Sequence, residues 1–171
     1  NNIIVHNCSA QSKVIRVGRR SGQTYMMALM MVHEMLVNDK YRVLVVSPYA
    51  VQTGEVIKTF LDLCSRLPDN PVKSSKQTPV WEINFHNGSV LMGFTAATNA
   101  DSVRGQTANR IVLDEVDDIP EVAIVSVMAI KMSVPDVKVW RSGNTKRKRN
   151  LNKAEQDPMN KCFHYPSYVI P

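Results

Sequence analysis

The chain has 171 residues, 44% of them hydrophobic, and its 21 Lys and Arg outnumber its 15 Asp and Glu to give a net charge of +6. This length and composition predict one globular domain with a sizeable core and exclude a wholly disordered chain. No apolar run approaches the roughly 20 residues of a membrane span and no signal-peptide pattern opens the chain, so we expect neither a membrane protein nor a secreted one. The basic excess is compatible with an anionic partner such as nucleic acid.

The three cysteines, Cys8, Cys64 and Cys162, are odd in number and widely spaced, which favours a reducing compartment over a disulfide framework. His6 lies beside Cys8, and His164 lies beside Cys162. These two pairs would supply a tetrahedral Zn²⁺ site if the termini met, although such pairs on adjacent strands more often only pack.

Signals for strands and helices alternate along the first part of the chain. Residues 13–17 predict a short strand, which runs into a glycine-bearing turn at residues 18–22. Residues 24–37 are rich in long unbranched side chains and predict a helix. Residues 42–46 form a nearly continuous apolar run, as expected for a strand covered on both faces, and residues 51–67 predict an amphipathic helix.

The middle of the chain predicts a loop and a hairpin. Residues 68–79 are polar and proline-rich, so we expect a surface loop there. Residues 81–85 and 89–94 predict two strands, and the Asn87-Gly88 pair between them supplies the positive-φ residues of a tight hairpin turn.

The alternation returns after residue 109. Residues 110–113 predict a buried strand, residues 121–132 a helix, and residues 137–140 a further strand that leads to a polar turn at residues 141–144.

The end of the chain is more polar. We expect a basic and polar loop at residues 146–160 and a last strand around residues 162–165. Taken together, the alternating elements predict an α/β fold with a mainly parallel central sheet flanked by helices.

The turn after the first strand and the start of the following helix make a candidate phosphate site. The P-loop pattern G-x-x-x-x-G-K-[ST] cradles phosphates with backbone N–H groups and places a Lys on the β- and γ-phosphates and a hydroxyl on Mg²⁺. Here the stretch reads Gly18, Arg19, Arg20, Ser21, Gly22, Gln23 and Thr24. The second glycine and the threonine fit, the first glycine is one position late, and a glutamine replaces the lysine. A turn that binds no phosphate is the alternative.

Gln23 is the main departure from the P-loop pattern. A neutral amide can hydrogen-bond a phosphate oxygen but cannot neutralise the charge that spreads over the γ-phosphoryl group. Three explanations remain open: Arg19 or Arg20 supplies the missing charge, the site binds nucleotide but turns it over slowly, or Gln23 is an engineered replacement of a lysine.

Two carboxylates, Asp114 and Glu115, follow the strand at residues 110–113. Ligands of open α/β sheets bind outside the carboxyl ends of the strands. We therefore expect Asp114 to hold Mg²⁺ and Glu115 to orient and deprotonate the water that attacks the γ-phosphate. Alternatively, both residues cap the following helix together with Asp117 and Asp118. The order and spacing of the two motifs favour an ATPase that uses ATP and Mg²⁺.

The set of motifs resembles the ATPase domain of viral large terminase subunits of the tailed-bacteriophage type, which pump double-stranded DNA into a preformed capsid. The resemblance covers residues 14–171. It rests on residues 18–24 and 111–115 together with Val45-Val46-Ser47-Pro48, Ser102-Val103-Arg104-Gly105 and Ser142-Gly143-Asn144. It implies a P-loop NTPase fold of the RecA/ASCE-like class, with residues 1–171 as a single ATPase domain. The family's nuclease domain is absent from the sequence, so we expect a fragment.

The resemblance also implies roles for individual residues. Arg19 matches an arginine that contacts the γ-phosphate, Thr24 the Mg²⁺-binding hydroxyl, Asp114 the Walker B aspartate and Glu115 the catalytic glutamate. Ser142, Gly143 and Asn144 match the motif that couples hydrolysis to DNA movement.

The partners that the resemblance implies are double-stranded DNA, a portal protein and a small terminase subunit. It further implies a homo-oligomeric ring in the host cytoplasm, at the procapsid portal. The basic run Lys146, Arg147, Lys148 and Arg149 is a candidate DNA contact, or alternatively a solvated charge run.

Two other functions fit parts of the pattern. Residues 114–117 also match the tetrad of DExD/H helicase-like ATPases, which need a second RecA-like domain. A degenerate nucleotide-binding module, weakened by Gln23, is the third possibility.

Overall fold

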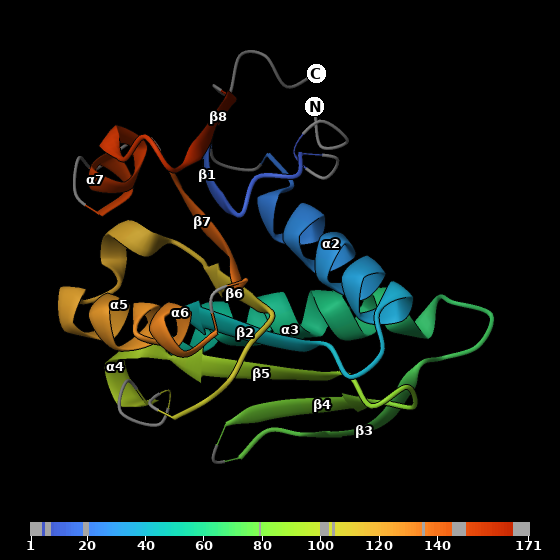
Figure 1. Ribbon diagram of the computed structural model, residues 1–171. Coiled ribbons are helices and arrows are strands. Elements are labelled where there is room, and N and C mark those ends of the chain that lie inside the picture. The colour runs from blue at the N-terminus through green and yellow to red at the C-terminus, as the bar shows by residue number, and fades with distance from the viewer. Residues whose placement is uncertain are drawn as a thin grey trace.

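The computed structural model describes residues 5, 8–18, 21–78, 80–99, 103, 105–134, 136–144 and 150–165. These residues build one mixed sheet flanked by helices on both faces (Figure 1). The strands are β1 (Ser12–Val17), β2 (Arg42–Ser47), β3 (Val72–Lys76), β4 (Trp81–Phe85), β5 (Val90–Thr95), β6 (Arg110–Leu113), β7 (Lys138–Asn144) and β8 (Lys161–Tyr165). Their order in the sheet is β3-β4-β5-β2-β6-β7-β1-β8.

Strands β5, β2, β6, β7, β1 and β8 run parallel to one another, and β4 and β3 extend the sheet antiparallel at the β5 edge. The predicted hairpin is confirmed: Gly88 has φ 81, and its N–H donates to the carbonyl of Phe85 at 3.1 Å. The mainly parallel α/β sheet predicted from the alternating elements is therefore present, with one antiparallel hairpin at its edge.

The helices are α2 (Gln23–Val37), α3 (Ala50–Ser65), α4 (Ala96–Asn99), the 3₁₀ turn η2 (Val116–Asp118), α5 (Glu121–Met128), α6 (Ile130–Ser133) and α7 (Asn150–Gln156). Alternate side chains of the inner strands face opposite sides of the sheet, as strand geometry requires. Ile15, for example, lies in a core with α2 and α3, whereas its neighbour Val14 lies in a second core with α5, α6 and Leu151 of α7. Both faces are covered, which explains the continuous apolar runs of β2 and β6.

Three loop predictions need correction. Residues 72–76, expected in a loop, form β3, an exposed edge strand whose polar sequence carries no strand signal. Residues 141–144, expected as a turn, are the last residues of β7. Residues 150–156, expected within a loop, form α7, which is held by contacts with distant parts of the chain. The predicted helix at residues 121–132 is divided at Ala129 into α5 and α6.

A buried charged cluster lies at the end of β6 far from Asp114. Arg110, 2% exposed, donates from Nε to Glu34 Oε2 of α2 at 2.9 Å and stacks its guanidinium 3.8 Å from the ring centre of Trp140. Tyr41 also donates to Glu34, and burial is the main cause that raises the pKa of Tyr41 to about 12. The cluster joins α2 to the sheet at the start of β6, away from the edge where the carboxyl ends of the parallel strands meet.

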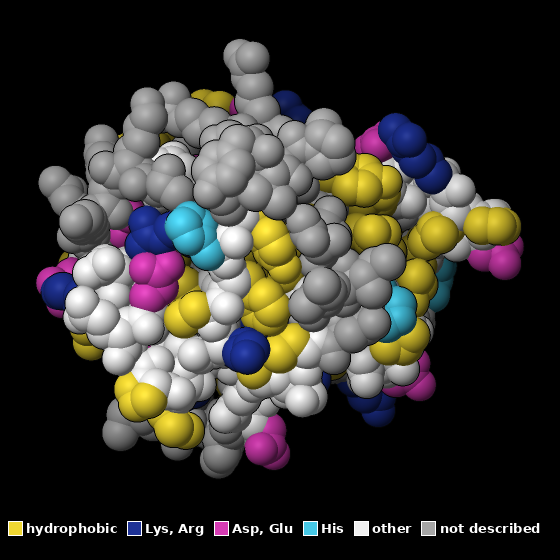
Figure 2. Space-filling view, turned by 90° about the horizontal axis from the view of Figure 1, so that it is seen from above, with side chains coloured by type: hydrophobic (Ala, Val, Ile, Leu, Met, Phe, Trp, Pro, Cys, Tyr) yellow, Lys and Arg dark blue, Asp and Glu magenta, His cyan; other side chains and the backbone are white. Residues whose placement is uncertain are grey.

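Helix α2 leaves one side open to solvent. Its exposed large hydrophobic side chains are Tyr25, Leu29, Leu36 and Val37. Hydrophobic side chains are visible over the right-hand part of the face in Figure 2, where α2 lies. Across the described helices, none combines the length and apolar character that a membrane crossing requires.

The described part of the chain shows no group of three His, Cys, Asp or Glu residues that could hold a metal. Cys8 is half-buried and packs against the core beneath α2, while Cys162 of β8 is exposed and pairs in register with Val14. His6, the remaining member of the predicted zinc pair, lies outside the described residues.

Candidate functional site

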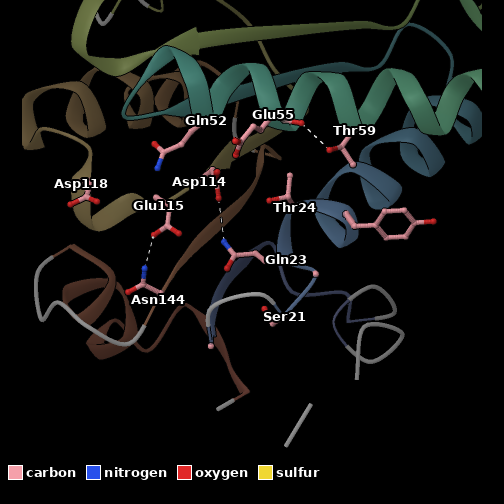
Figure 3. Close-up of a pocket in the computed structure, with 13 residues that line it drawn as sticks. Ser21, Gln23, Thr24, Gln52, Glu55, Thr59, Asp114, Glu115, Asp118 and Asn144 are labelled. Carbon is pink, nitrogen blue, oxygen red and sulfur yellow. Dashed lines mark hydrogen bonds between the residues drawn. The ribbon is translucent and has the colours of Figure 1, made fainter. Parts of the chain in front are cut away.

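Three adjacent parallel strands deliver the predicted site residues to one edge of the sheet. β6 leads to Asp114 and Glu115, β7 ends at Asn144, and β1 leads to Gly18. These ends line a single cavity of about 610 Å³, which α3 closes from the opposite side (Figure 3). Its lining residues are Gly18, Ser21, Gly22, Gln23, Thr24, Tyr25, Gln52, Glu55, Thr59, Asp114, Glu115, Asp118 and Asn144. The two predicted motifs therefore face each other across one space.

The phosphate-loop candidate joins β1 to α2 through a left-handed glycine. Gly22, with φ 74, is the residue before α2, and its carbonyl accepts the first helical hydrogen bond, from Met26 N–H at 2.9 Å. A side chain at this φ would be strained, which explains the glycine. At the other end of the loop, Gly18 N–H donates to the carbonyl of Tyr165 in β8 at 3.0 Å. No acidic side chain occupies the first turn of α2, so the positive end of the helix is open to an anion.

Asp114 is 6% exposed and accepts two hydrogen bonds on Oδ1, from Gln23 Nε2 at 3.2 Å and from Ser142 Oγ at 3.1 Å. Burial raises the pKa of Asp114 and the negative charge of Glu55 adds to this effect, whereas the two hydrogen bonds lower it. Gln23 thus connects the phosphate-loop candidate directly to the carboxylate that ends β6.

Glu115 has a left-handed backbone, with φ 48 and ψ 51, which is uncommon for a residue with a side chain. Such strain often marks a functional position, because the surrounding structure has to maintain it. Asn144 Nδ2 donates to Glu115 Oε2 at 3.5 Å, and Figure 3 shows the carboxylate between Asn144 and α3. The backbone conformation and this contact together direct the carboxylate into the cavity.

The three residues of the predicted coupling motif lie in β7, beside both motifs. Ser142 bonds Asp114 and also lies 3.2 Å from the carbonyl of Leu113. Gly143 leaves room for α7, because a Cβ there would lie 3.2 Å from Leu151 Cδ2. Because Ser142 contacts Asp114 and Asn144 contacts Glu115, a shift of β7 would alter the hydrogen bonds of both carboxylates.

Helix α3 contributes three cavity residues that the motifs did not reveal: Gln52, Glu55 and Thr59. Their spacing places them on one face of the helix, where Figure 3 shows them opposite Gln23 and Asp114. In the sequence, the only indication of these residues is that their polar side chains interrupt the apolar pattern of α3. Tyr25 and Asp118 also line the cavity without having been predicted as site residues.

Several predicted site residues lie outside the described part of the chain. They are Arg19 and Arg20 of the phosphate-loop candidate, and Lys146, Arg147, Lys148 and Arg149 of the basic run. The run connects Asn144, the last residue of β7, with Asn150, the first residue of α7.

No protein-family model matches the sequence, and no curated protein matches it. Solved structures do match. The large terminase ATPase domain of Thermus phage P74-26 has a TM-score of 0.80 and 18% identity, covering 99% of this chain and 81% of that one. The large terminase of bacteriophage HK97 has a TM-score of 0.76 and 11% identity, covering 95% of this chain and 37% of that one. The large terminase of a thermophilic bacteriophage, solved in complex with ADP, has a TM-score of 0.69 and 18% identity, covering 91% of this chain and 40% of that one.

The fold is therefore that of P-loop NTPases, with a mainly parallel α/β sheet. Within that class, the structural neighbours are phage large terminase ATPase domains, as the sequence motifs predict. The chain spans most of the isolated ATPase domain but less than half of the complete terminases.

Proposed function

We propose that this chain is the ATPase domain of a phage DNA-packaging motor and hydrolyses ATP in the cavity at the carboxyl ends of β1, β6 and β7. The observation that carries the proposal is the meeting of the loop at residues 18–24 with Asp114 and Glu115 across one cavity. One neighbouring terminase, from a thermophilic bacteriophage, was solved with ADP, which supports a nucleotide as the ligand.

Thr24 and Asp114 fit Mg²⁺, because Mg²⁺ prefers hydroxyl and carboxylate oxygens and both residues line the cavity. The ion would neutralise charge on the β- and γ-phosphates when bound. The backbone N–H groups of residues 21–24, at the end of the loop and the start of α2, bind the phosphates, and Arg19 and Arg20 are the cations of the loop. The Ser21 hydroxyl is buried without a hydrogen-bond partner among the described residues and fits a phosphate oxygen.

Glu115 is the proposed general base. It takes a proton from the attacking water, and Asn144 holds its carboxylate by the contact with Oε2. When the γ-phosphate leaves, the hydrogen bonds from Ser142 to Asp114 and from Asn144 to Glu115 change together, which would transmit hydrolysis to β7.

The proposal extends to the whole motor. The chain would act on double-stranded DNA in a homo-oligomeric ring, with a portal protein and a small terminase subunit, in the host cytoplasm at the procapsid. Lys146, Arg147, Lys148 and Arg149 would contact DNA phosphates. Residues 1–171 would form the single ATPase domain of a longer chain.

The test compares the chain with its Glu115→Gln variant. We expect both to bind ATPγS with Mg²⁺ equally, because the substitution keeps the shape of the side chain. Phosphate release by the variant should fall by about 10²- to 10⁴-fold, because the base is lost. Equilibrium binding and a phosphate-release assay measure the two effects. Failure of the unsubstituted chain to bind any adenine nucleotide would refute the proposal.

A nucleotide-binding module without turnover is the second candidate, and Gln23 favours it. Its neutral amide stands where P-loop NTPases have a lysine, and it bonds Asp114. Nucleotide binding without measurable phosphate release, even with DNA and the neighbouring domains present, would support this function instead.

A further inference from the structure

Gln52 lies in the first turn of α3, across the cavity from the end of β6. Figure 3 shows its carboxamide extending from the helix toward Glu115. Its Oε1 is buried and has no hydrogen-bond partner among the described residues. Buried polar atoms are rarely left without a partner, because desolvation of each costs about 1–3 kcal/mol. The carboxamide therefore has hydrogen-bonding capacity left for a polar group in the space between Gln52 and Glu115.

The opposite side of this space is already organised. Asn144 contacts Glu115 Oε2, and the left-handed backbone of Glu115 keeps its carboxylate at the cavity wall. Asp114, the proposed metal ligand, is the adjacent residue and is held by Gln23 and Ser142. The space between Gln52 and Glu115 thus lies directly beside the place where the proposal puts the γ-phosphate.

We propose that Gln52 and Glu115 together hold the water that attacks the γ-phosphate. This inference rests on the proposed ATPase function. Glu115 accepts a proton from the water, while Gln52 can accept a hydrogen bond through Oε1 and donate one through Nε2 to the water or to a γ-phosphate oxygen. The water oxygen forms a bond to the γ-phosphorus, and the bond from that phosphorus to the bridging oxygen of ADP breaks. The proton passes to the Glu115 carboxylate, and ADP and inorganic phosphate are the products.

The chemistry of the side chain agrees with this role. Glu55, Asp114, Glu115 and Asp118 already place carboxylates on the cavity wall, so another negative charge would repel the triphosphate. A carboxamide orients water without adding charge. Gln52 therefore suits the position beside the base better than an acidic residue would.

The test measures binding of Mg²⁺–ADP alone and of Mg²⁺–ADP with aluminium fluoride, which mimics the phosphoryl group in transfer. Gln52→Ala removes the carboxamide, and Gln52→Met replaces it with a side chain of similar length; both residues favour helix, so α3 should persist. Gln156→Ala, at an exposed helical glutamine, is the matched control. The unsubstituted chain should bind the fluoride complex at least tenfold more tightly than ADP.

We expect Gln52→Ala and Gln52→Met to lose most of this preference and about 10²-fold in kcat, with the Kd for ADP within twofold of the unsubstituted value. Gln156→Ala should change neither. Retention of the preference, equal weakening of both complexes, or no preference in the unsubstituted chain would each overturn the role of Gln52. In all three cases binding of ADP would leave the proposed nucleotide site standing, whereas absence of ADP binding would remove the proposed function itself.

Discussion

Gln23 is the residue whose chemistry most affects the proposed activity. Its amide donates to Asp114 Oδ1, so a neutral group contacts a carboxylate that burial already disfavours in its ionised form. A lysine at this position would place an ammonium group beside Asp114 and within reach of the phosphates. The ammonium would lower the pKa of Asp114 and would neutralise charge on the γ-phosphate.

We therefore predict that Gln23→Lys raises kcat for phosphate release by about 10²-fold, the effect expected of one charged group at a transferring phosphoryl. The measurement is steady-state phosphate release with saturating Mg²⁺ and ATP. Gln23→Met is the control: methionine is a long side chain like lysine but carries no charge, so this variant should show no gain. Appreciable release by the unsubstituted chain, with no gain for lysine, would instead assign the cationic role to Arg19 or Arg20.

The residues of the site differ in how well sequence could predict them. Thr24, Asp114 and Glu115 stand in short motifs beside strand ends, and parallel strands bring such ends to one edge whatever the details of packing. Gln52 carries no motif. Its place in the cavity depends on the rotation of α3 over the sheet, which the side chains of distant strands determine. Periodicity identifies the polar face of that helix but not the residue it faces.

At the scale of elements, α7 connects the two halves of the site. Arg16, two residues before Gly18, donates from Nε and Nη2 to the Glu155 carboxylate, each at 2.7 Å. At the other end of α7, Asp117 Oδ1 accepts from Leu151 N–H at 2.7 Å. The helix therefore joins the strand before the phosphate-loop candidate to the turn after Glu115.

We predict that Glu155→Gln lowers the free energy of unfolding by about 1–3 kcal/mol, because it leaves the nearly buried Arg16 guanidinium without its charged partner. Urea denaturation of both proteins measures the change. Glu121→Gln is a matched control, since Glu121 of α5 pairs with Lys153 of α7 but both side chains are exposed, 69% for Glu121 and 67% for Lys153. That pair should contribute less than about 1 kcal/mol. Equal losses in the two variants would contradict the role of the Arg16–Glu155 pair.

The same helix shows where prediction from sequence ends. α7 has seven residues, too few for a stable helix by itself, and Leu151 is its buried apolar anchor. Contacts from β1 and η2 stabilise it, and none of them is visible in a local pattern. β3 is similar, because its polar residues form a strand through pairing with β4. By contrast β2, β6 and α3 carry their own periodicity and lie close to their predicted positions.

At the scale of the whole molecule, a carboxylate that the proposed site needs lowers the stability of the fold. Asp114 lies in the middle of the sheet edge, and burial is the main cause that raises its pKa. A carboxylate with a raised pKa in the fold costs stability at any pH where it is ionised. This cost shrinks as the pH falls below the raised pKa, and it is gone once the pH is below the lower pKa of the unfolded chain. Functional sites commonly carry such a cost.

We predict opposite effects of Asp114→Asn on the free and the nucleotide-bound protein. Without nucleotide, the variant should melt at a higher temperature than the unsubstituted chain at pH 7, and this difference should shrink as the pH is lowered, because Asp114 then becomes neutral as well. With Mg²⁺–ATPγS at about 100 times its Kd, binding should stabilise the unsubstituted chain by about 2.7 kcal/mol, or roughly 5–10 °C in Tm. The variant should lose most of that increase, because its amide binds Mg²⁺ weakly.

Thermal unfolding followed by circular dichroism, with chelator in place of Mg²⁺ as the control, measures both proteins with and without nucleotide. A lower Tm for the free variant would show that Asp114 stabilises the fold, and a full nucleotide shift in the variant would remove Asp114 from the metal site.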